Sequence, residues 1–342
     1  MTIEGQAKHA FNWYKQRAVE LDNEMHRNDG KLPLHELWRR QYYEYPYLLL
    51  ESNEIILERF ADIFTNCLDI SVEGKITPTP MLDNDARLAR YFTEVIEETN
   101  WRGILNKGSM QPAFVQLNEY FKNEIPLGVE MFKELPVKQE QYLYKFSKRD
   151  FVREMLKTGR FRISPASYYS KGSHIKAIKD FETERNYRLK AIQEVMQGIS
   201  SIEVQGNTLE IINGVVPLDV VMEDYFLFST CNELSRRMPT DFESNAVLII
   251  KDKHEFLSRL ESELIMSYPG WEVLERDVYY YDTYNDHPND RNQEFYKHIS
   301  YAYQREHRCI LRPKRTGIQK DKLKPFFVEL GSIEDIAEAI YI

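Results

Sequence analysis

Three polar residues near the carboxyl end of the chain have the types and spacing of a chemical site. Gln304, Glu306 and Arg308 alternate in sequence just before the apolar run 309–311. If this segment is a strand, alternate side chains share a face, so the amide, the carboxylate and the guanidinium lie together. Such a carboxylate can stabilise positive charge in a reaction, and Arg308 could hold it by an ion pair. A charge-rich edge strand with an exposed arginine is the alternative.

The elements that must position these residues come from a chain of 342 residues, of which 42% are hydrophobic and 13% aromatic. That length fits two domains, and the apolar content is sufficient for their cores. The net charge of −9 argues against a protein that coats nucleic acid generally. Residues 143–190 nevertheless contain 13 Lys and Arg against 5 Asp and Glu, which predicts a localised anion site. A solvated basic helix face is the alternative.

The sequence argues against a membrane protein and against a metal protein. No apolar run approaches the ~20 residues that span a bilayer, and residues 1–6 lack the basic and apolar regions of a secretory signal. We therefore expect a cytoplasmic protein with no membrane partner. Cys67, Cys231 and Cys309 have no CxxC spacing, which predicts buried or inert thiols. The eight histidines form no HExxH pattern, so we expect no metal.

Residues 1–138 are expected to form an all-α N-terminal domain. Apolar residues recur there at intervals of three and four, as on the buried face of a helix. The predicted helices are 10–25, 34–43, 48–68, 86–99 and 113–123. Proline and glycine turns separate them. The aromatic run 38–47 is interpreted as part of the core of this domain.

Residues 139–342 are expected to form an α+β domain with a mainly antiparallel sheet. Short runs rich in aromatic and β-branched residues alternate there with helical segments. The predicted strands are 142–146, 161–163, 202–204, 208–212, 225–229, 246–250, 278–281, 307–311 and 326–328. The predicted helices are 150–158, with Gly159 as its C-cap, and a long charged helix at 175–197.

Three segments of this second domain together resemble the ADP-ribosyltransferase-like domains of bacterial toxins and defence proteins. They are a strand, helix and glycine-ended turn at 142–161, a strand with Ser-Thr near its end at 225–231, and a glutamate strand at 304–306. The resemblance covers residues 141–342 and is nearest to the nucleic-acid-modifying toxins that include DarT and CmdT. The sequence departs from the family in the first segment, where Tyr144 or Lys145 stands in place of the usual His or Arg.

The resemblance implies an ADP-ribosyltransferase-like split sheet and NAD as the substrate. Breaking the bond between nicotinamide and ribose leaves a positively charged, oxocarbenium-like sugar, so a carboxylate against that ribose stabilises mainly the transition state. Glu306 is the predicted catalytic residue for this role. Gln304 is predicted to orient the acceptor, and a hydrogen-bonded sheet residue is the alternative for it.

The resemblance also implies a set of residues that bind NAD. Lys145, Arg160 and Arg162 are cationic donors suited to the pyrophosphate. The complete predicted set is Tyr144, Lys145, Arg160, Arg162, Ser164, Tyr168, Tyr169, Ser229 and Thr230. The last two tyrosines would stack on nicotinamide or on a target base, or else simply pack. The hydroxyls of Ser229 and Thr230 would hold the nicotinamide ribose, or else cap a turn.

The predicted function is therefore NAD-dependent ADP-ribosylation of a nucleic acid, either RNA or DNA, by an intracellular toxin or antiphage effector of the glycosyltransferase class. The alternatives are NAD glycohydrolase activity, RNA 2′-phosphate transfer, ADP-ribosylation of a protein, and a non-catalytic binding or sensor module on the same fold. Residues 282–291 are a candidate target-recognition loop. The N-terminal domain is a candidate surface for an antitoxin or another inhibitor protein.

Overall fold

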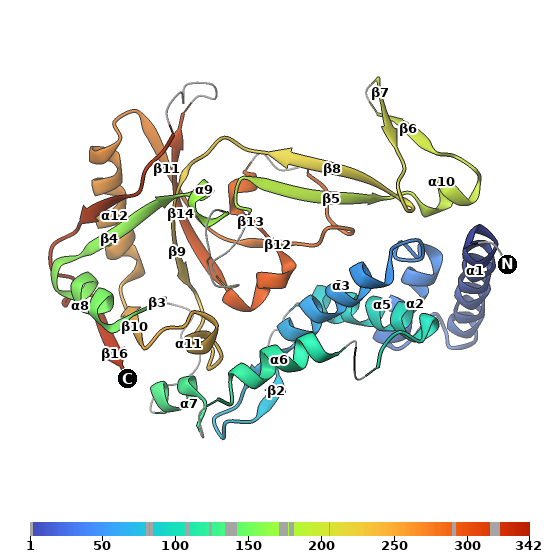
Figure 1. Cartoon of the computed structure of the whole chain (residues 1–342), viewed down its shortest axis with the longest axis horizontal. Coiled ribbons are helices and arrows are strands. Elements are labelled where there is room, and N and C mark those ends of the chain that lie inside the picture. Colours follow the sequence, from blue (N-terminus) through green and yellow to red (C-terminus); the bar gives the residue numbers. More distant parts are fainter. Residues whose placement is uncertain are drawn as a thin grey trace.

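The computed structural model contains a mainly helical half and a half built on a large antiparallel sheet, at opposite ends of an elongated molecule (Figure 1). The structure describes residues 3–79, 82, 85–106, 108, 110–122, 125–133, 142–170, 177, 181–204, 206–288, 292–314 and 322–342. The mixture of helices with a mainly antiparallel sheet confirms the expected α+β class.

The described helices of the helical half include α1 (Ile3–Arg27), α2 (Leu34–Glu44), α3 (Asn53–Asn66), α5 (Ala86–Arg102), α6 (Gln111–Glu119) and α7 (Leu127–Met131). Residues of α1, α2, α3 and α5 form a common hydrophobic core, whereas Met131 of α7 belongs to a separate cluster with Tyr144 and Val247 of the sheet half. Helix α3 begins later than the predicted helix 48–68, because the Ser52 side chain accepts a hydrogen bond from the Ile55 amide and caps it. None of the described helices is both long enough and apolar enough to cross a lipid bilayer.

The helical half also contains a β-hairpin, so the expectation of an all-α N-terminal domain is wrong. Strands β1 (Leu68–Ile70) and β2 (Ile76–Pro78) pair antiparallel directly after α3. Both strands carry isoleucine, whose β-branched side chain favours extended backbone. Gly74 lies in the turn between them with a φ of +74°, a conformation that glycine adopts without a steric cost.

The two halves share one hydrophobic cluster. Tyr42 and Tyr47 are buried in it, which confirms the interpretation of the run 38–47 as core. Tyr280 and Ile299, which belong to the sheet half, are buried in the same cluster. Since apolar burial is favourable wherever it occurs, this shared cluster joins the halves, while the large sheet also has a core of its own around Leu248 and Phe256.

The sheet half is organised by six strands in the order β11-β14-β9-β3-β10-β16. Their bounds are β3 (Leu143–Ser147), β9 (Phe226–Cys231), β10 (Ala246–Ile250), β11 (Trp271–Asp277), β14 (Glu306–Pro313) and β16 (Ala337–Tyr341). The helices of this half are α8 (Arg149–Thr158), α9 (Ala166–Tyr169), α10 (Ile192–Met196), α11 (Met238–Asp241) and α12 (Lys253–Ser267), with short 3-10 helices η1 (Gln293–Phe295) and η2 (Ile299–Gln304). The predicted strands 142–146, 246–250 and 307–311 are confirmed, whereas β11 and β16 were not predicted.

An arm of two strands joins the sheet at β9 and splits it. Strand β4 (Arg160–Pro165) pairs with β15 (Phe326–Glu329) and, through Ser164 opposite Leu227, with the start of β9. Strand β3 meets the end of the same β9, through Tyr144 opposite Cys231. Because β3 and β4 pair with different ends of β9, these two strands diverge and leave the sheet open beside the middle residues of β9.

The segment that leads into this opening folds as predicted. Helix α8 ends at Gly159, whose φ is +61° and whose amide donates a hydrogen bond to the Met155 carbonyl. A Cβ atom at this position would lie 2.1 Å from the Gly331 carbonyl oxygen. Glycine is therefore required both by the helix end and by the close approach of the neighbouring chain.

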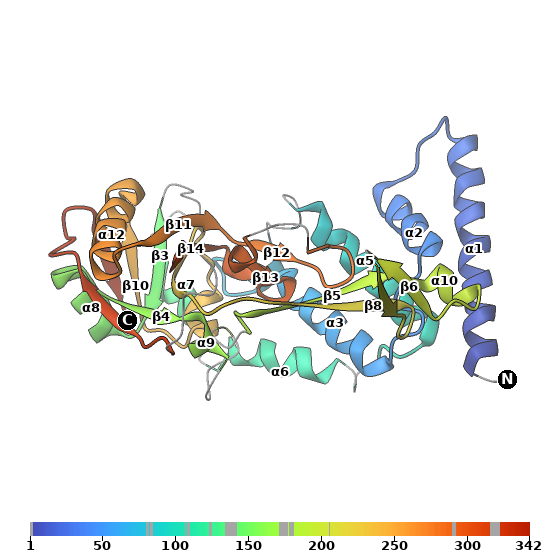
Figure 2. The same cartoon turned by 90° about the horizontal axis from the view of Figure 1, so that it is seen from above.

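The prediction of a long helix at 175–197 is wrong. Within it, β5 (Glu184–Lys190) pairs antiparallel with β8 (Val215–Val221), and α10 follows; residues 175–176 and 178–180 lie outside the described residues. The charged sequence of β5 suits an exposed two-stranded ribbon, in which successive side chains alternate between the two faces and Tyr187 is buried. Figures 1 and 2 show this ribbon reaching from the sheet half toward the helical half, where Arg188 Nη1 donates to Glu51 Oε1 at 2.6 Å.

Two further strand pairs complete the described fold. The hairpin of β6 (Ser201–Val204) and β7 (Asn207–Glu210) projects at the helical end of the ribbon (Figure 1). The pair of β12 (Tyr279–Tyr281) and β13 (Tyr296–His298) is parallel, contacts η2 and lies in the middle of the molecule (Figure 1). The latter pair carries side chains that reach the cavity described next.

Candidate active site

A cavity of about 550 Å³ lies where β3 and β4 diverge over β9. All of the catalytic and NAD-binding residues predicted from the sequence line it: Tyr144, Lys145, Arg160, Arg162, Ser164, Tyr168, Tyr169, Ser229, Thr230, Gln304 and Glu306. A cavity of this size can enclose much of a cofactor-sized molecule. The split of the sheet thus gathers residues that are far apart in sequence around one space.

The carboxylate of Glu306 is surrounded by donors. Its Oε1 accepts hydrogen bonds from Ser229 Oγ at 2.5 Å and from Arg308 Nε at 2.7 Å, and its Oε2 accepts one from Lys297 Nζ at 2.9 Å. Burial opposes ionisation, but the charges of Arg308 and Lys297 outweigh it and hold the pKa of Glu306 well below its usual range. Glu306 is therefore an anion at neutral pH.

Arg308 supports Glu306 and is not an exposed strand residue. Its side chain is fully buried, and its Nη2 donates to Glu182 Oε1 at 2.7 Å while its Nη1 donates to the Glu294 carbonyl at 2.7 Å. The alternative of a surface arginine is wrong. A guanidinium with three fixed acceptors holds the glutamate in one orientation, because its planar fork of donors cannot turn without losing hydrogen bonds.

Two residues of this charge cluster were missed in the sequence. Lys297 on β13 bonds to Glu306, and Glu182 lies 3.8 Å from Lys297 Nζ. Burial opposes the ionisation of Glu182, but Arg308 and Lys297 hold the pKa of this carboxyl below its ordinary value. No motif or spacing marks either residue, since their association exists only in the folded chain.

The prediction that Gln304 and Glu306 share a strand face is wrong, although their side chains lie in the same network. Gln304 ends helix η2, Arg305 follows in the left-handed region with a φ of +45°, and Glu306 is the first residue of β14 rather than the last residue of a strand. Lys297 Nζ joins the two side chains by donating to Gln304 Oε1 at 3.0 Å. Gln304 Nε2 donates to the Ala177 carbonyl at 2.8 Å, so both ends of this amide are occupied.

Two cations face the cavity without a carboxylate partner among the described residues. Lys145 Nζ donates to the Ser229 carbonyl at 2.6 Å, and burial lowers the pKa of Lys145 while Cys231 and Glu306 oppose that shift. The Arg162 guanidinium lies 4.6 Å from the centre of the Tyr168 ring. These two side chains come from β3 and β4, one on each side of the opening, and are available to an anionic ligand.

The remaining predicted residues form the walls and rim of the cavity. Arg160 lies over the ring of Phe327 at 4.1 Å and is already paired with Glu154 at 2.7 Å, so it is less available than Arg162. Tyr144 and Ser164 are buried in the walls, Tyr168 and Tyr169 stand edge to face, and Thr230 donates to the His307 carbonyl at 3.4 Å. Of these, Thr230 has a mainly structural contact.

No protein-family model, curated protein or solved structure matches this chain. What the cavity can do chemically is therefore argued from its own side chains. They provide the carboxylate of Glu306 with that of Glu182 close by, two cations that have no carboxylate partner within the described residues, and aromatic rings at the mouth. Within the described residues, no group of three or more His, Cys, Asp or Glu side chains is arranged to hold a metal ion.

All three cysteines are buried, as predicted. Cys231 lines the cavity and lies opposite Glu306 in the pairing of β9 with β14. Burial, with a smaller contribution from the charge of Glu306, raises the pKa of Cys231 to about 12. Burial likewise raises the pKa of Cys67 and of Cys309 to about 12. The cavity therefore contains a thiol but no thiolate nucleophile at neutral pH.

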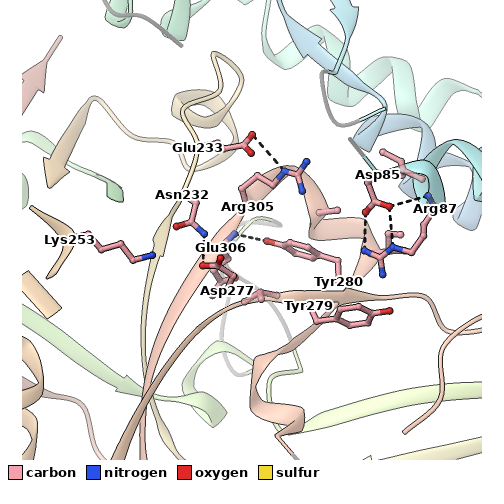
Figure 3. A pocket seen from close by; sticks show the side chains of 14 residues that line it. Asp85, Arg87, Asn232, Glu233, Lys253, Asp277, Tyr279, Tyr280, Arg305 and Glu306 are labelled. Carbon is pink, nitrogen blue, oxygen red and sulfur yellow. Dashed lines mark hydrogen bonds and ion pairs between the residues drawn. The ribbon is translucent and has the colours of Figure 1, made fainter. Parts of the chain in front are cut away.

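A second cavity, of about 420 Å³, includes Glu306 in its lining and lies against the start of α5 (Figure 3). In its middle the Glu306 amide donates to the Tyr280 hydroxyl at 2.7 Å. Its charged groups are largely paired with one another: Arg87 with Asp85 at 2.9 Å, Asn232 with Asp277 at 2.7 Å, and Arg305 with Glu233 at 3.7 Å. This internal pairing makes it less suited to an anion than the first cavity.

The start of the candidate target-recognition loop is fixed in place. Asp282 is fully buried and forms an ion pair with Arg59 of α3 at 2.6 Å. Its Oδ1 also accepts hydrogen bonds from the amides of Tyr284 and Asn285. These residues fasten the sheet half to the helical half, so residues 282–285 do not form a free recognition surface; residues 289–291 lie outside the described part of the chain.

Proposed function

We propose that this protein cleaves the nicotinamide–ribose bond of NAD and transfers ADP-ribose to a nucleic acid. The observation that carries the proposal is Glu306, a buried carboxylate held ionised by Arg308 and Lys297 at a cavity where Lys145 and Arg162 have no carboxylate partner among the described residues. As nicotinamide leaves with the bonding electron pair, positive charge develops on the ribose. A preorganised anion stabilises that charge more in the transition state than in the bound substrate.

Lys145 and Arg162 are the proposed ligands of the NAD pyrophosphate. Neither has a carboxylate partner among the described residues, and they lie on the two strands that border the opening. Charge-assisted hydrogen bonds to phosphate oxygens would replace water there. In this proposal Ser229 keeps Glu306 oriented through its hydroxyl, and Tyr168 and Tyr169 contact the nicotinamide or a base.

A basic and aromatic rim supports a nucleic acid as the acceptor. Phe151, on α8, is 59% exposed and lines the cavity, and Arg160 and Arg162 of β4 contribute cations to the same lining. Phe327, on β15, is 49% exposed and also lines the cavity. Cations suit phosphates and flat exposed rings suit bases, so the combination is typical of surfaces that contact nucleic acid.

NAD hydrolysis is a second candidate, and the state of Gln304 favours it. The amide of Gln304 is 2% exposed and bonds to Lys297 and to the Ala177 carbonyl. Its Nε2 also donates to the Tyr303 hydroxyl at 3.3 Å, so the amide already bonds at both ends to described residues and is poorly placed to orient a macromolecular acceptor. Water would then receive the ADP-ribosyl group, with loss of a proton.

Labelled NAD distinguishes these reactions. Wild-type protein would be incubated with NAD labelled in the adenylate, together with separate pools of DNA, RNA and protein, while nicotinamide release is measured. Transfer predicts label in a nucleic-acid pool, whereas hydrolysis predicts nicotinamide release with free ADP-ribose. Absence of both nicotinamide release and label in every pool would overturn the enzymatic proposal.

Glu306→Gln is the decisive variant, with Glu203→Gln as its control. We expect a loss of about 100- to 1000-fold in nicotinamide release for Glu306→Gln, the usual effect of removing one preorganised electrostatic contact. Glu203 is exposed on the remote β6–β7 hairpin, so its variant should match the wild type. Thermal unfolding of both variants would separate a loss of chemistry from a loss of fold.

A further inference from the structure

The helical half directly contacts the segment that precedes the proposed catalytic glutamate. Asn66, at the last position of α3, is fully buried and faces helix η2. Its Nδ2 donates to the Ser300 carbonyl at 2.9 Å, and its Oδ1 accepts from the Tyr303 amide at 2.8 Å. The same Nδ2 donates to the Asp62 carbonyl at 2.7 Å, which fixes the side chain to its own helix. One amide side chain thus fixes both a donor and an acceptor of η2.

A second contact holds the same segment from the sheet half. The Arg237 guanidinium lies 4.1 Å from the centre of the Tyr303 ring, and its Nη1 donates to the carbonyls of Thr65 at 2.5 Å and Leu68 at 3.0 Å. Arg237 is 3% exposed and is paired with Asp241 at 2.8 Å. The end of α3 and helix η2 are therefore joined by groups that are buried or partly buried, where hydrogen bonds are hard to replace.

The backbone between η2 and Glu306 requires such support. Arg305 has a φ of +45°, a region that costs a non-glycine residue free energy and persists only where the surroundings enforce it. The Asn232 amide donates to the Arg305 carbonyl at 2.7 Å, and the Glu306 amide donates to the Tyr280 hydroxyl at 2.7 Å, as Figure 3 shows for the latter. Asn66 secures the other end of this short segment.

We propose that Asn66 is a positioning residue for Gln304 and Glu306, an inference that rests on the proposed NAD chemistry. Asn66 acts through η2. The fixed helix positions Gln304, and the side chains of Gln304 and Glu306 both accept hydrogen bonds from Lys297 Nζ. The turn at Arg305 then begins from a defined point. The helical half is then a working part of the active site. This differs from a role as a detachable surface for an inhibitor protein.

The first test is the kinetic effect of Asn66→Ala. We expect kcat for nicotinamide release to fall by about 10- to 100-fold, since a small displacement of a catalytic group is costly in rate. The KM for NAD should stay within about threefold, because the pyrophosphate ligands lie on β3 and β4. Thr99→Val is the matched control: Thr99 is fully buried in the helical half, but among the described residues its hydroxyl bonds only to the Ile96 carbonyl of its own helix.

Hydrogen exchange measured by mass spectrometry gives a readout that does not depend on activity. Asn66→Ala should speed exchange of the amides in 299–306 by at least about tenfold relative to Thr99→Val, because the Tyr303 amide loses its acceptor. Asn66→Asp keeps that acceptor and loses the donor to Ser300, so its exchange rate should lie between those of Asn66→Ala and Thr99→Val. If Asn66→Ala does not fold, Asn66→Asp takes its place in both measurements. An unchanged exchange rate and kcat in the Asn66 variants, or a rise in KM at constant kcat, would overturn the proposal.

The two proposals can fail separately. If the wild type releases no nicotinamide, the proposed function fails, while the exchange measurement still shows whether Asn66 holds the segment 299–306. If the wild type is active and Thr99→Val loses as much kcat as Asn66→Ala at equal thermal stability, the positioning role fails and the NAD chemistry stands.

Discussion

Both halves of the molecule bury carboxylates, but they surround them with different donors. In the helical half, Glu94 is 3% exposed; its Oε2 accepts a hydrogen bond from the Tyr47 hydroxyl at 2.6 Å, and its Oε1 lies 3.5 Å from Arg90 Nε. In the sheet half, Glu306 is 5% exposed, and Arg308 and Lys297 donate to it. Burial raises the pKa of Glu94 despite the Tyr47 hydrogen bond, whereas two adjacent cations depress the pKa of Glu306.

The difference shows which buried carboxylate suits catalysis. The Tyr47 hydroxyl and the more distant cation Arg90 do not offset the loss of hydration of a charge on Glu94. At Glu306 the adjacent cations do offset this loss, and they leave an anion that is ready before any substrate arrives. Of Glu94 and Glu306, it is Glu306 that lies in the lining of the 550 Å³ cavity. We therefore interpret Glu94 as a structural acid and Glu306 as a reactive one.

Exchanging each carboxylate for an amide would test this contrast most strongly. Glu306→Gln should lower nicotinamide release by about 100- to 1000-fold, whereas Glu94→Gln should keep it within about twofold, since glutamine still accepts the Tyr47 hydrogen bond. The rate per folded molecule would be compared after thermal unfolding of each variant. Equal losses of nicotinamide release in the two variants would contradict the assignment of Glu306 as reactive and Glu94 as structural.

Removing one cation from the buried charge network around Glu306 should destabilise the fold. Lys297→Met leaves Glu306 and Glu182 with less compensating charge, and breaking a buried ion pair from one side typically costs about 3–5 kcal/mol of folding free energy. Urea unfolding would measure the cost. Lys251, partly exposed and paired with Glu338, is the matched control, and Lys251→Met should change stability by less than about 1 kcal/mol. Similar values for both variants would show that the buried network contributes little.

The same variant has an expected pH signature. The pKa of Glu306 is depressed in the folded protein, so the stability it contributes is present above the unfolded value of about 4.3 and is lost as the pH falls toward the folded pKa. Activity of the wild type should therefore stay level from pH 8 down to about pH 5. In Lys297→Met the pKa of Glu306 rises, and the acid limb of the pH–rate profile should move to higher pH. A profile that does not move would argue against Lys297 as the source of the depressed pKa.

A smaller effect is expected in the tyrosine network of the helical half. Tyr47→Phe removes the donor to Glu94 and an acceptor of Arg59, at a cost of about 1–3 kcal/mol for buried groups left unpaired. The kcat for nicotinamide release should be unchanged. Tyr45→Phe, at a 44% exposed position, is the control and should leave stability nearly unaltered. A fall in kcat without a fall in stability would show that this tyrosine network contributes to the reaction.

The smallest expected effect concerns NAD affinity. Arg162→Ala should raise the KM for NAD by about tenfold, the loss of roughly one charged hydrogen bond, with little change in kcat. Arg153→Ala removes an exposed cation that does not line the cavity, and its KM should match the wild type. Indistinguishable KM values for the two variants would exclude Arg162 from the pyrophosphate site.

Local sequence signals located much of the sheet half, including the strand, helix and glycine turn that lead to the cavity. Gly159 could be predicted because a helix end and a left-handed backbone both favour glycine. The β5–β8 ribbon could not, because the charged sequence of β5 suits a helix equally well and only its partner strand decides the outcome. The sequence of either strand alone does not indicate a partner strand that lies 20 or more residues away.

The candidate site shows the same limit. Glu306 and its cavity partners could be proposed from short segments in order, but Lys297 and Glu182 meet them only through tertiary packing. The left-handed turn at Arg305 was also unforeseen, since arginine gives no sign of a positive φ. As a result the sequence suggested one flat strand face, whereas the structure brings the same side chains together from a helix end and a strand start.

The buried thiol of Cys231 has a practical consequence. It lies opposite Glu306 in the cavity, and its pKa of about 12 keeps it protonated, as burial does for the other two cysteines. Alkylating reagents react with thiolates, so all three native positions should be slow to label at neutral pH. A cysteine introduced at exposed Phe151 would then be a single attachment point for a fluorophore at the mouth of the cavity. Such a probe would report ligand entry without altering the native cysteines.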